Sequence, residues 1–240
     1  MKKITNKLLF SGLAVVIAFY CIFVISVITT SCVYNEKNDG HDSGSTTESQ
    51  VTRDLEAFDA IKNEGMCDIV YVQSEKSAVE ITAPARYIDR FETDVDDGVL
   101  RIDVLGKIRG RNAEKFSIKV YSPTCRSIKN EGVGKISCDS LCSDTLIVKN
   151  EGVGSIELKK LSVSHLKADN EGVGAISVEV IDAEYVHLDN EGVGSVSISG
   201  KAEKAKLVNE GIGEIDASGL DCEDVGISNE GLGNILTKNM

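Results

Sequence analysis

The 240-residue chain contains no tryptophan, only three histidines and few aromatic side chains of any kind. Histidine is the side chain most often used in general acid–base catalysis, and His41, His165 and His187 lie far apart in the sequence or outside any recognisable motif. Aromatic rings on which a sugar could stack are equally scarce. The composition therefore disfavours an enzyme, including one that acts on polysaccharides.

Helix-forming patterns are also missing after the first 31 residues. Short alternating apolar and polar runs separated by polar turns, such as residues 69–72, 99–104 and 116–120, indicate β-strands instead. Only two prolines occur, and Pro123 marks the entry to a regular repeat. The sequence predicts an all-β protein.

Seven cysteines are present, but they contain no CxxC pair and have no neighbouring histidine, which argues against metal and redox chemistry. Cys21 and Cys32 lie near the N-terminus. The other five are an odd number and do not recur with the repeat, so we expect mostly buried free thiols, with the disulfide state left open; they are Cys67, Cys125, Cys138, Cys142 and Cys222.

The dominant feature is a motif of Asn, Glu, Gly, an apolar residue and Gly that recurs six times. Successive copies are separated by 20, 20, 20, 19 and 20 residues. A period near 20 is too short for helix pairs and fits one rung of a β-solenoid, whose rungs bury their apolar faces only by stacking. Apolar residues two and four positions before each Asn, and six positions after it, have the period of two of half-buried strands.

The same alternation assigns a direction to the motif residues. It places each asparagine inside, where stacked amides can form a ladder, and each glutamate outside; the two glycines form a corner. The predicted ladder consists of Asn130, Asn150, Asn170, Asn190, Asn209 and Asn229.

The glutamates are the one row of the repeat whose side chains suggest a function. A file of carboxylates is a candidate site for Ca²⁺ or another hard cation, although the spacing differs from that of known calcium loops. The alternative is a solvated acidic stripe, because adjacent glutamates about 4.8 Å apart repel each other only weakly in water. The candidate metal ligands are Glu131, Glu151, Glu171, Glu191, Glu210 and Glu230; no other cofactor is expected.

The N-terminus has the organisation of an export signal. Three lysines precede a long apolar stretch from Leu8 to Ile28, and Thr29-Thr30-Ser31-Cys32 follows. A small residue before a cysteine at this point is similar to a bacterial lipobox, which predicts a lipoprotein signal peptide at 1–31 and lipidation of Cys32. The stretch is also long enough to span a bilayer, so a single N-terminal transmembrane anchor is the alternative.

The mature chain divides into three expected parts. Residues 32–52 are polar and predict a flexible linker or stalk. Residues 53–124 predict a β-rich module that pairs with the solenoid or caps its first coil, and they include a degenerate seventh motif at residues 63–69. Residues 125–240 predict the repeats. The net charge of −12 becomes −15 without residues 1–31, which disfavours nucleic acid as a partner.

The chain resembles a family known in Bacteroidetes-type bacteria, the putative auto-transporter adhesin, head GIN domain proteins. The resemblance covers nearly all of residues 53–240. It is carried by Phe58, Ile61 and Gly65 before Asp68-Ile69-Val70-Tyr71-Val72-Gln73, then by residues 98–102 and 118–123, and by the 20-residue Gly-x-Gly rungs. The resemblance implies right-handed parallel β-helical lipoproteins of the cell envelope, without catalytic or binding residues to transfer. Asn-Glu stands where many relatives carry Ser or Thr.

Three functions remain open at this point. The leading one is a non-catalytic, adhesin-like binding lipoprotein of the outer membrane, either periplasmic or surface-exposed, whose ligand is an unknown envelope or host-surface glycan or protein. The second is a polysaccharide-acting β-helix enzyme. The third is a structural, self-assembling envelope component.

Overall fold

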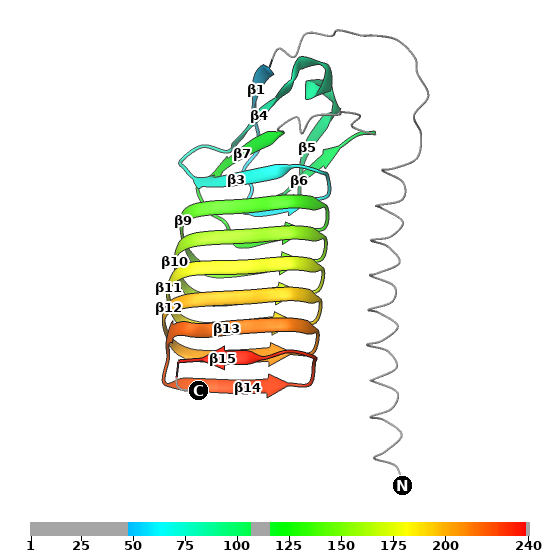
Figure 1. Cartoon of the computed structure of the whole chain (residues 1–240). Coiled ribbons are helices and arrows are strands. Elements are labelled where there is room, and N and C mark those ends of the chain that lie inside the picture. The colour runs from blue at the N-terminus through cyan, green and yellow to red at the C-terminus, as the bar shows by residue number, and fades with distance from the viewer. Residues whose placement is uncertain (1–47, 107–115, 239–240) are drawn as a thin grey trace, which may run out of the picture. The chain divides into compact units, whose positions relative to one another are not determined.

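The computed structural model describes residues 48–106 and 116–238. Within them the chain forms a parallel β-solenoid of about six turns, with additional strands at its N-terminal end (Figure 1). The predicted fold class is therefore confirmed. Residues 46–240 form one compact unit.

The full rungs are long strands that bend around the core. They are β9 (Val133–Asn150), β10 (Val153–Asn170), β11 (Val173–Asn190) and β12 (Val193–Asn209). The next turn is divided between β13 (Ile212–Asp221) and β14 (Asp224–Asn229), and β15 (Ile235–Thr237) follows. All these strands pair in parallel with their neighbours, so that equivalent residues of successive motifs lie side by side.

The first turn is assembled from segments that are distant in the sequence. Strand β2 (Ala60–Asn63) pairs in parallel with β8 (Ser127–Asn130), and β3 (Asp68–Gln73) pairs with β9. Asn63 is thereby in register with Asn130. The degenerate seventh motif is a true rung, and strand pairing crosses the boundary that the sequence placed between residues 124 and 125.

The remaining strands extend this turn away from the repeats. They are β1 (Glu48–Asp54), β4 (Ala78–Pro84), β5 (Phe91–Asp96), β6 (Val99–Val104) and β7 (Ser117–Ser122), with a 3-10 helix at Ala85–Arg90. Strands β7 and β6 add in parallel to β3 and β2, while β4, β1 and β5 add antiparallel. The expected stalk at 32–52 overlaps β1, whose residues 48–52 pair with β4; residues 32–47 lie outside the described residues.

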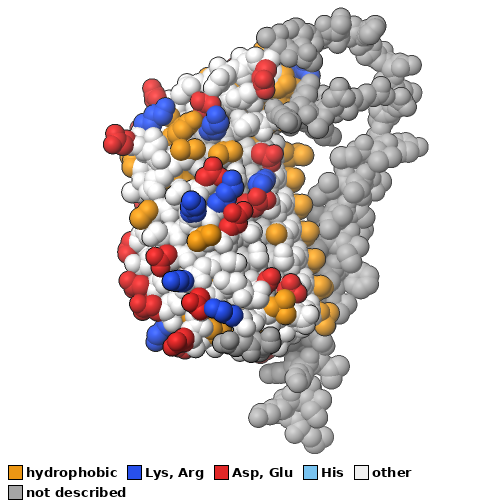
Figure 2. All heavy atoms as spheres, turned by 60° about the vertical axis from the view of Figure 1, so that its left-hand side comes forward, with side chains coloured by type: hydrophobic (Ala, Val, Ile, Leu, Met, Phe, Trp, Pro, Cys, Tyr) orange, Lys and Arg blue, Asp and Glu red, His pale blue; other side chains and the backbone are white. Residues whose placement is uncertain are grey.

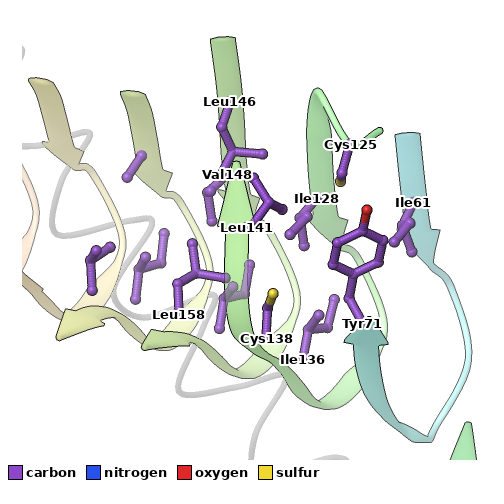
Figure 3. Close-up of a cluster of buried hydrophobic side chains, with 14 of the residues drawn as sticks. Ile61, Tyr71, Cys125, Ile128, Ile136, Cys138, Leu141, Leu146, Val148 and Leu158 are labelled. Atoms are coloured by element: carbon purple, nitrogen blue, oxygen red, sulfur yellow. The ribbon is translucent and has the colours of Figure 1, made fainter. Parts of the chain in front are cut away.

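One continuous core runs through both parts. Figure 3 shows Ile61, Tyr71 and Ile128 pointing into the same interior as Cys138 and Leu158. Tyr71 is in register with Cys138, which lies in the next turn. The Tyr71 hydroxyl lies 3.2 Å from both the carbonyl and the hydroxyl oxygen of Ser122. The buried polar end of this ring is thus satisfied inside the core.

The one 19-residue spacing is absorbed at a single place. Strand β12 lacks one residue where Ile181 of β11 lies opposite Gly200. A Cβ at Gly200 would lie 2.2 Å from the carbonyl oxygen of Ile181. Gly200 therefore interrupts the apolar row of Leu161, Ile181 and Leu220, while the motif glycines and asparagines on either side keep their register.

The motif corners are where neighbouring backbones come closest. Gly174 has φ +147°, and a Cβ placed on it would lie 1.7 Å from the carbonyl oxygen of Gly154. Such a contact cannot be relieved by a side-chain movement because the obstacle is backbone.

We predict that Gly174→Ala destabilises the protein by about 3 kcal/mol or more, because the new methyl group forces two rungs apart. Gly226→Ala is the matched control, since its Cβ would meet nothing closer than 3.9 Å, and we expect a change below about 1 kcal/mol. Urea denaturation of both variants measures the difference, and equal midpoints would contradict the proposed corner constraint.

Candidate binding faces of the solenoid

The asparagine side chains form one hydrogen-bonded file inside the solenoid. Each Nδ2 donates to the Oδ1 of the asparagine in the next turn, at 2.8–2.9 Å. The file begins at Asn63, one member earlier than the six predicted, and Asn130, Asn150, Asn170, Asn190 and Asn209 are fully buried. Asn229 continues the file but is exposed, because no further turn among the described residues covers it.

Both ends of the file are closed by groups of the chain itself. Asn63 Oδ1 accepts hydrogen bonds from the backbone N–H of Gly65 and the thiol of Cys67. Asn229 Nδ2 donates to the carbonyl oxygen of Gly233 at 3.0 Å. No ladder amide is left without a partner, as buried amides require.

The glutamates lie outside, as alternation indicated, and extend to Glu64. We call Glu64, Glu131, Glu151, Glu171, Glu191, Glu210 and Glu230 the glutamate row; its members are exposed or half-buried. The residues before the ladder asparagines share this outer surface with them, and we call the surface as a whole the corner face.

In the N-terminal half of the corner face, lysines neutralise the row. Lys129 Nζ lies 2.6 Å from Glu131 and 3.0 Å from Glu151, and Lys149 lies 2.8 Å from both Glu151 and Glu171. Lys62 bridges Glu64 and Glu131 in the same way. Burial raises the pKa of Glu131, but hydrogen bonds from Lys129 and Lys62 outweigh it and hold this pKa below its usual value.

These ammonium groups occupy the spaces between successive carboxylates that a bound Ca²⁺ would need. Among the described residues, no three His, Cys, Asp or Glu side chains are arranged to hold a metal ion. In this half the glutamate row is an ion-pair network, a third arrangement beside the cation site and the free acidic stripe considered above.

The charge pattern changes abruptly in the C-terminal half. Asp169 and Asp189 replace the bridging lysines at the same position of the repeat. Among the described residues, Glu191, Glu210 and Glu230 form no ion pair. Burial, Glu171 and Glu210 together raise the pKa of Glu191. We call this part, from Asp169 to Leu232, the acidic half of the corner face.

Three buried polar atoms in this half have no hydrogen-bond partner: Asp169 Oδ1, Asp189 Oδ1 and His187 Nε2. Within the described part of the chain they are the only buried side-chain nitrogen or oxygen atoms in that condition. Asp169 is only 7% exposed, and its other carboxylate oxygen is paired with Lys167 at 2.5 Å. Burial and the nearby Glu191 and Asp169 raise the pKa of Asp189 to about 6.

Beside the glutamates runs a second row that the sequence interpretation did not assign. The apolar residue after the first motif glycine faces outward in every turn. These residues form the apolar ridge, which consists of Met66, Val133, Val153, Val173, Val193, Ile212 and Leu232. Strand register stacks these residues one above another. Such a column of hydrophobic side chains runs down the right-hand edge of Figure 2. The signal was present in the sequence, because the apolar residue is two positions after an outward glutamate.

A shallow groove of about 660 Å³ crosses the rungs at a different corner. Its walls come from the equivalent segments of β9 to β13, with small side chains such as Ser143, Ser162 and Ala183 between acidic ones. The acidic members are Asp144, Asp182, Glu184, Glu203 and Asp221; Lys201 is the one basic residue of the lining, and Lys238 beside it pairs with Asp221 at 2.7 Å. The groove thus runs along the solenoid axis and is negatively charged.

The cysteines of the described region are all free. Cys67, Cys125 and Cys138 are buried, Cys142 is exposed and Cys222 is half-buried. Burial raises the pKa of the Cys138 thiol to about 11, which keeps it protonated and unreactive. Cys32, the predicted lipidation site, lies outside the described residues.

Comparison with known proteins identifies the family of this chain. Residues 57–238 match the family described as "Putative auto-transporter adhesin, head GIN domain", so the chain belongs to this family. No curated protein matches this chain.

The solved structures that are similar share the fold. A "putative adhesin" from Parabacteroides distasonis ATCC 8503 has a TM-score of 0.72 and 24% identity over 80% of this chain and 83% of that one. A "putative adhesin" from Parabacteroides merdae ATCC 43184 has a TM-score of 0.70 and 21% identity over 80% and 98%. A "Putative lipid binding protein" from P. distasonis ATCC 8503 has a TM-score of 0.67 and 18% identity over 80% and 98%.

Two of these solved chains consist almost entirely of the matched part. The compact unit of residues 46–240, with its own continuous core, therefore contains what this fold requires.

We predict that Asn170→Leu destabilises the protein by about 3 kcal/mol, because it leaves Asn150 Nδ2 and Asn190 Oδ1 buried without partners. Asn229→Leu, at the exposed end of the same ladder, leaves only Asn209 Nδ2 without its acceptor, and we expect it to cost about half as much. Denaturation midpoints that are the same for both variants would show that the ladder contributes little.

A second prediction concerns pH. Because the pKa of Asp189 is raised by folding, to about 6, its contribution to stability is complete below its unfolded pKa and is lost as the pH rises through 6. Asp189→Asn should therefore stabilise the protein at pH 7.5 but change little at pH 3, below the unfolded pKa of 3.8. Urea denaturation of the variant and wild type across this pH range measures the difference, and Asp144→Asn, in the open groove, is the control. A pH-independent difference would contradict the shift.

Proposed function

We propose that the protein is an exported, membrane-tethered, non-catalytic binding lipoprotein of the bacterial cell envelope with an adhesin-like role. The observation that carries this proposal is the groove, which is formed by the same segment of five successive turns. A straight, repetitive groove on a rigid solenoid suits an extended ligand that lies along the axis. Membership of the adhesin family and the names of the similar solved structures support the same class.

The chemistry of the groove limits the ligand. Its walls carry five carboxylates and one ammonium group, so an anionic polymer would be repelled. Small hydroxyl and methyl side chains between the acids leave room for a chain of repeating units. We therefore propose an uncharged or cationic glycan, or an extended protein segment, of the envelope or of a host surface.

Tethering is assigned to Cys32 through a diacylglyceryl-type lipid anchor, at the outer membrane. The alternative is retention of residues 8–28 as a transmembrane anchor. Among the residues that the structure describes, no helix has the length and hydrophobicity to cross a membrane.

The binding role is tested with residues 46–240 on a glycan array and in pull-downs from isolated envelopes. We expect a ligand that is retained by the wild type and lost from Ala183→Trp, which fills the groove. Ala175→Trp lies outside the groove and serves as the control. Retention of nothing by the wild type would reject the function; equal retention by Ala183→Trp would reject the groove.

The anchor is tested in the full-length chain in a bacterial host. Cys32→Ala should accumulate as an unprocessed precursor and lose labelling by a fatty-acid analogue, because the thiol that carries the lipid is gone. Cys21→Ala, within the apolar stretch, should be processed and labelled normally. Membrane retention without labelling in the wild type would favour the transmembrane anchor.

A further inference from the structure

The apolar ridge is the most unusual surface of the molecule. A column of seven outward apolar side chains stands on a chain with a formal charge of −12, and Met66 and Leu232 are 64% and 73% exposed. A glycine precedes and follows each ridge residue except Met66, which Cys67 follows, so no adjacent side chain covers the other six. Contiguous exposed apolar surface of this kind marks an interaction site in soluble domains.

The charges beside the ridge differ along its length. Next to Val133 and Val153 the glutamates are bridged by lysines, whereas next to Val193, Ile212 and Leu232 they are not. The acidic half therefore presents an apolar column flanked by unpaired carboxylates. A partner that complements it must combine apolar side chains with positive charge.

A second, independent observation is that three buried polar atoms in the acidic half have no hydrogen-bond partner in the described chain. The orphaned Asp169 Oδ1, Asp189 Oδ1 and His187 Nε2 lie on adjacent turns of this same half. The two carboxylate oxygens accept hydrogen bonds only, and the imidazole nitrogen accepts when its Nδ1 carries the proton. Lysine and arginine side chains supply several N–H donors each. Their entry requires the side chains around these atoms, including the exposed Lys206 beside His187, to move, as exposed side chains do readily.

The spacing of the ridge selects the form of the partner. Ridge residues repeat at about 4.8 Å, one turn of an α-helix advances about 5.4 Å, and same-face residues of a strand are about 6.7 Å apart. Over the four turns from Val173 to Leu232 a helix laid along the axis falls out of step by roughly 2 Å, whereas a strand falls out of step by roughly 6 Å. A helix can also receive the ridge between its own rows of side chains.

We propose that the acidic half of the corner face is a docking site for a basic amphipathic α-helix of a partner protein. Apolar residues of the helix, one per turn, pack on Val173, Val193, Ile212 and Leu232. Lysine or arginine side chains on its flank pair with Glu191 and Glu210 and reach the orphaned acceptors. This inference rests on the proposed binding role and adds a partner class at a face other than the groove.

The test uses residues 46–240 and a fluorescent peptide of roughly 18 residues made of lysine and leucine in a helical pattern, long enough to span the four turns. Fluorescence anisotropy measures Kd at low and physiological salt. A peptide of the same composition in a strand pattern and a glutamate–leucine helix are the controls. We expect the lysine–leucine helix to bind most tightly.

The repeat supplies a matched control for the protein as well. Glu191→Gln with Glu210→Gln and Glu131→Gln with Glu151→Gln remove the same charge from the same row, in the acidic and in the lysine-bridged half. We expect the first pair to weaken binding by about fivefold to tenfold and the second by less than about twofold. Ile212→Ser should weaken binding, and Val133→Ser should not. Thermal denaturation verifies that each variant is folded.

Four outcomes would overturn the proposal. Equal weakening by both glutamate pairs would reduce the effect to net charge, and equal binding of the strand-patterned peptide would reject the helix. Absence of peptide binding together with binding to phosphatidylcholine vesicles would assign the ridge to a membrane. A ligand captured through the groove without any peptide binding would reject this site and leave the proposed function intact.

Discussion

The close approach of backbone to backbone at the motif corner is the constraint on which the rest of the structure depends. The glycine pair allows each turn to rest on the carbonyl oxygens of the previous one, with no space for a Cβ between them. That contact fixes the rung spacing, and the spacing in turn lets each asparagine amide reach its neighbour at hydrogen-bonding distance. The same corner turns the intervening apolar residue outward, so the ridge is a direct product of the packing rule.

Repetition holds the inside of the molecule nearly constant and leaves its outside free to vary. The ladder and the apolar rows recur from turn to turn, and even the shortened turn at Gly200 leaves the motif register unchanged. On the outer surface, a single position of the repeat changes from Lys129 and Lys149 to Asp169 and Asp189. That change, which affects neither the core nor the corner, divides one face into a neutral half and an acidic half.

The interior could be predicted from the sequence because each turn repeats the same pattern of apolar and polar positions. Alternation around Val148 and Asn150 recurs in register in the following turns, so the inward and outward phases were fixed by many concordant positions. The first turn was harder, since β2 and β8 pair across 67 residues between Asn63 and Asn130, and no periodicity marks such a pairing. Asn229 was expected inside because its motif is intact; its exposure depends on the absence of a covering turn among the described residues, which the motif does not encode.

The binding faces were the least predictable part. The lysine bridges could have been predicted, because Lys129 and Lys149 precede outward glutamates by two positions. The prediction of a cation site considered the glutamates without these lysines. The ridge was missed because a valine is ordinarily assigned to a core, and only the corner geometry shows that Val173 and Val193 have no interior to enter. The groove arises from five segments that are each unremarkable as sequence.

The asparagine ladder has a direction, since every amide donates toward the C-terminal end, from the cap at Gly65 and Cys67 to the cap at Gly233. A turn duplicated or deleted in the middle of the array would accept from one neighbour and donate to the other as before, so no amide would lose its partner. The terminal turns lack this freedom because their caps are made by residues of their own corners. The length of the solenoid, and with it the length of every face it carries, can therefore change by whole internal repeats while its two ends stay the same.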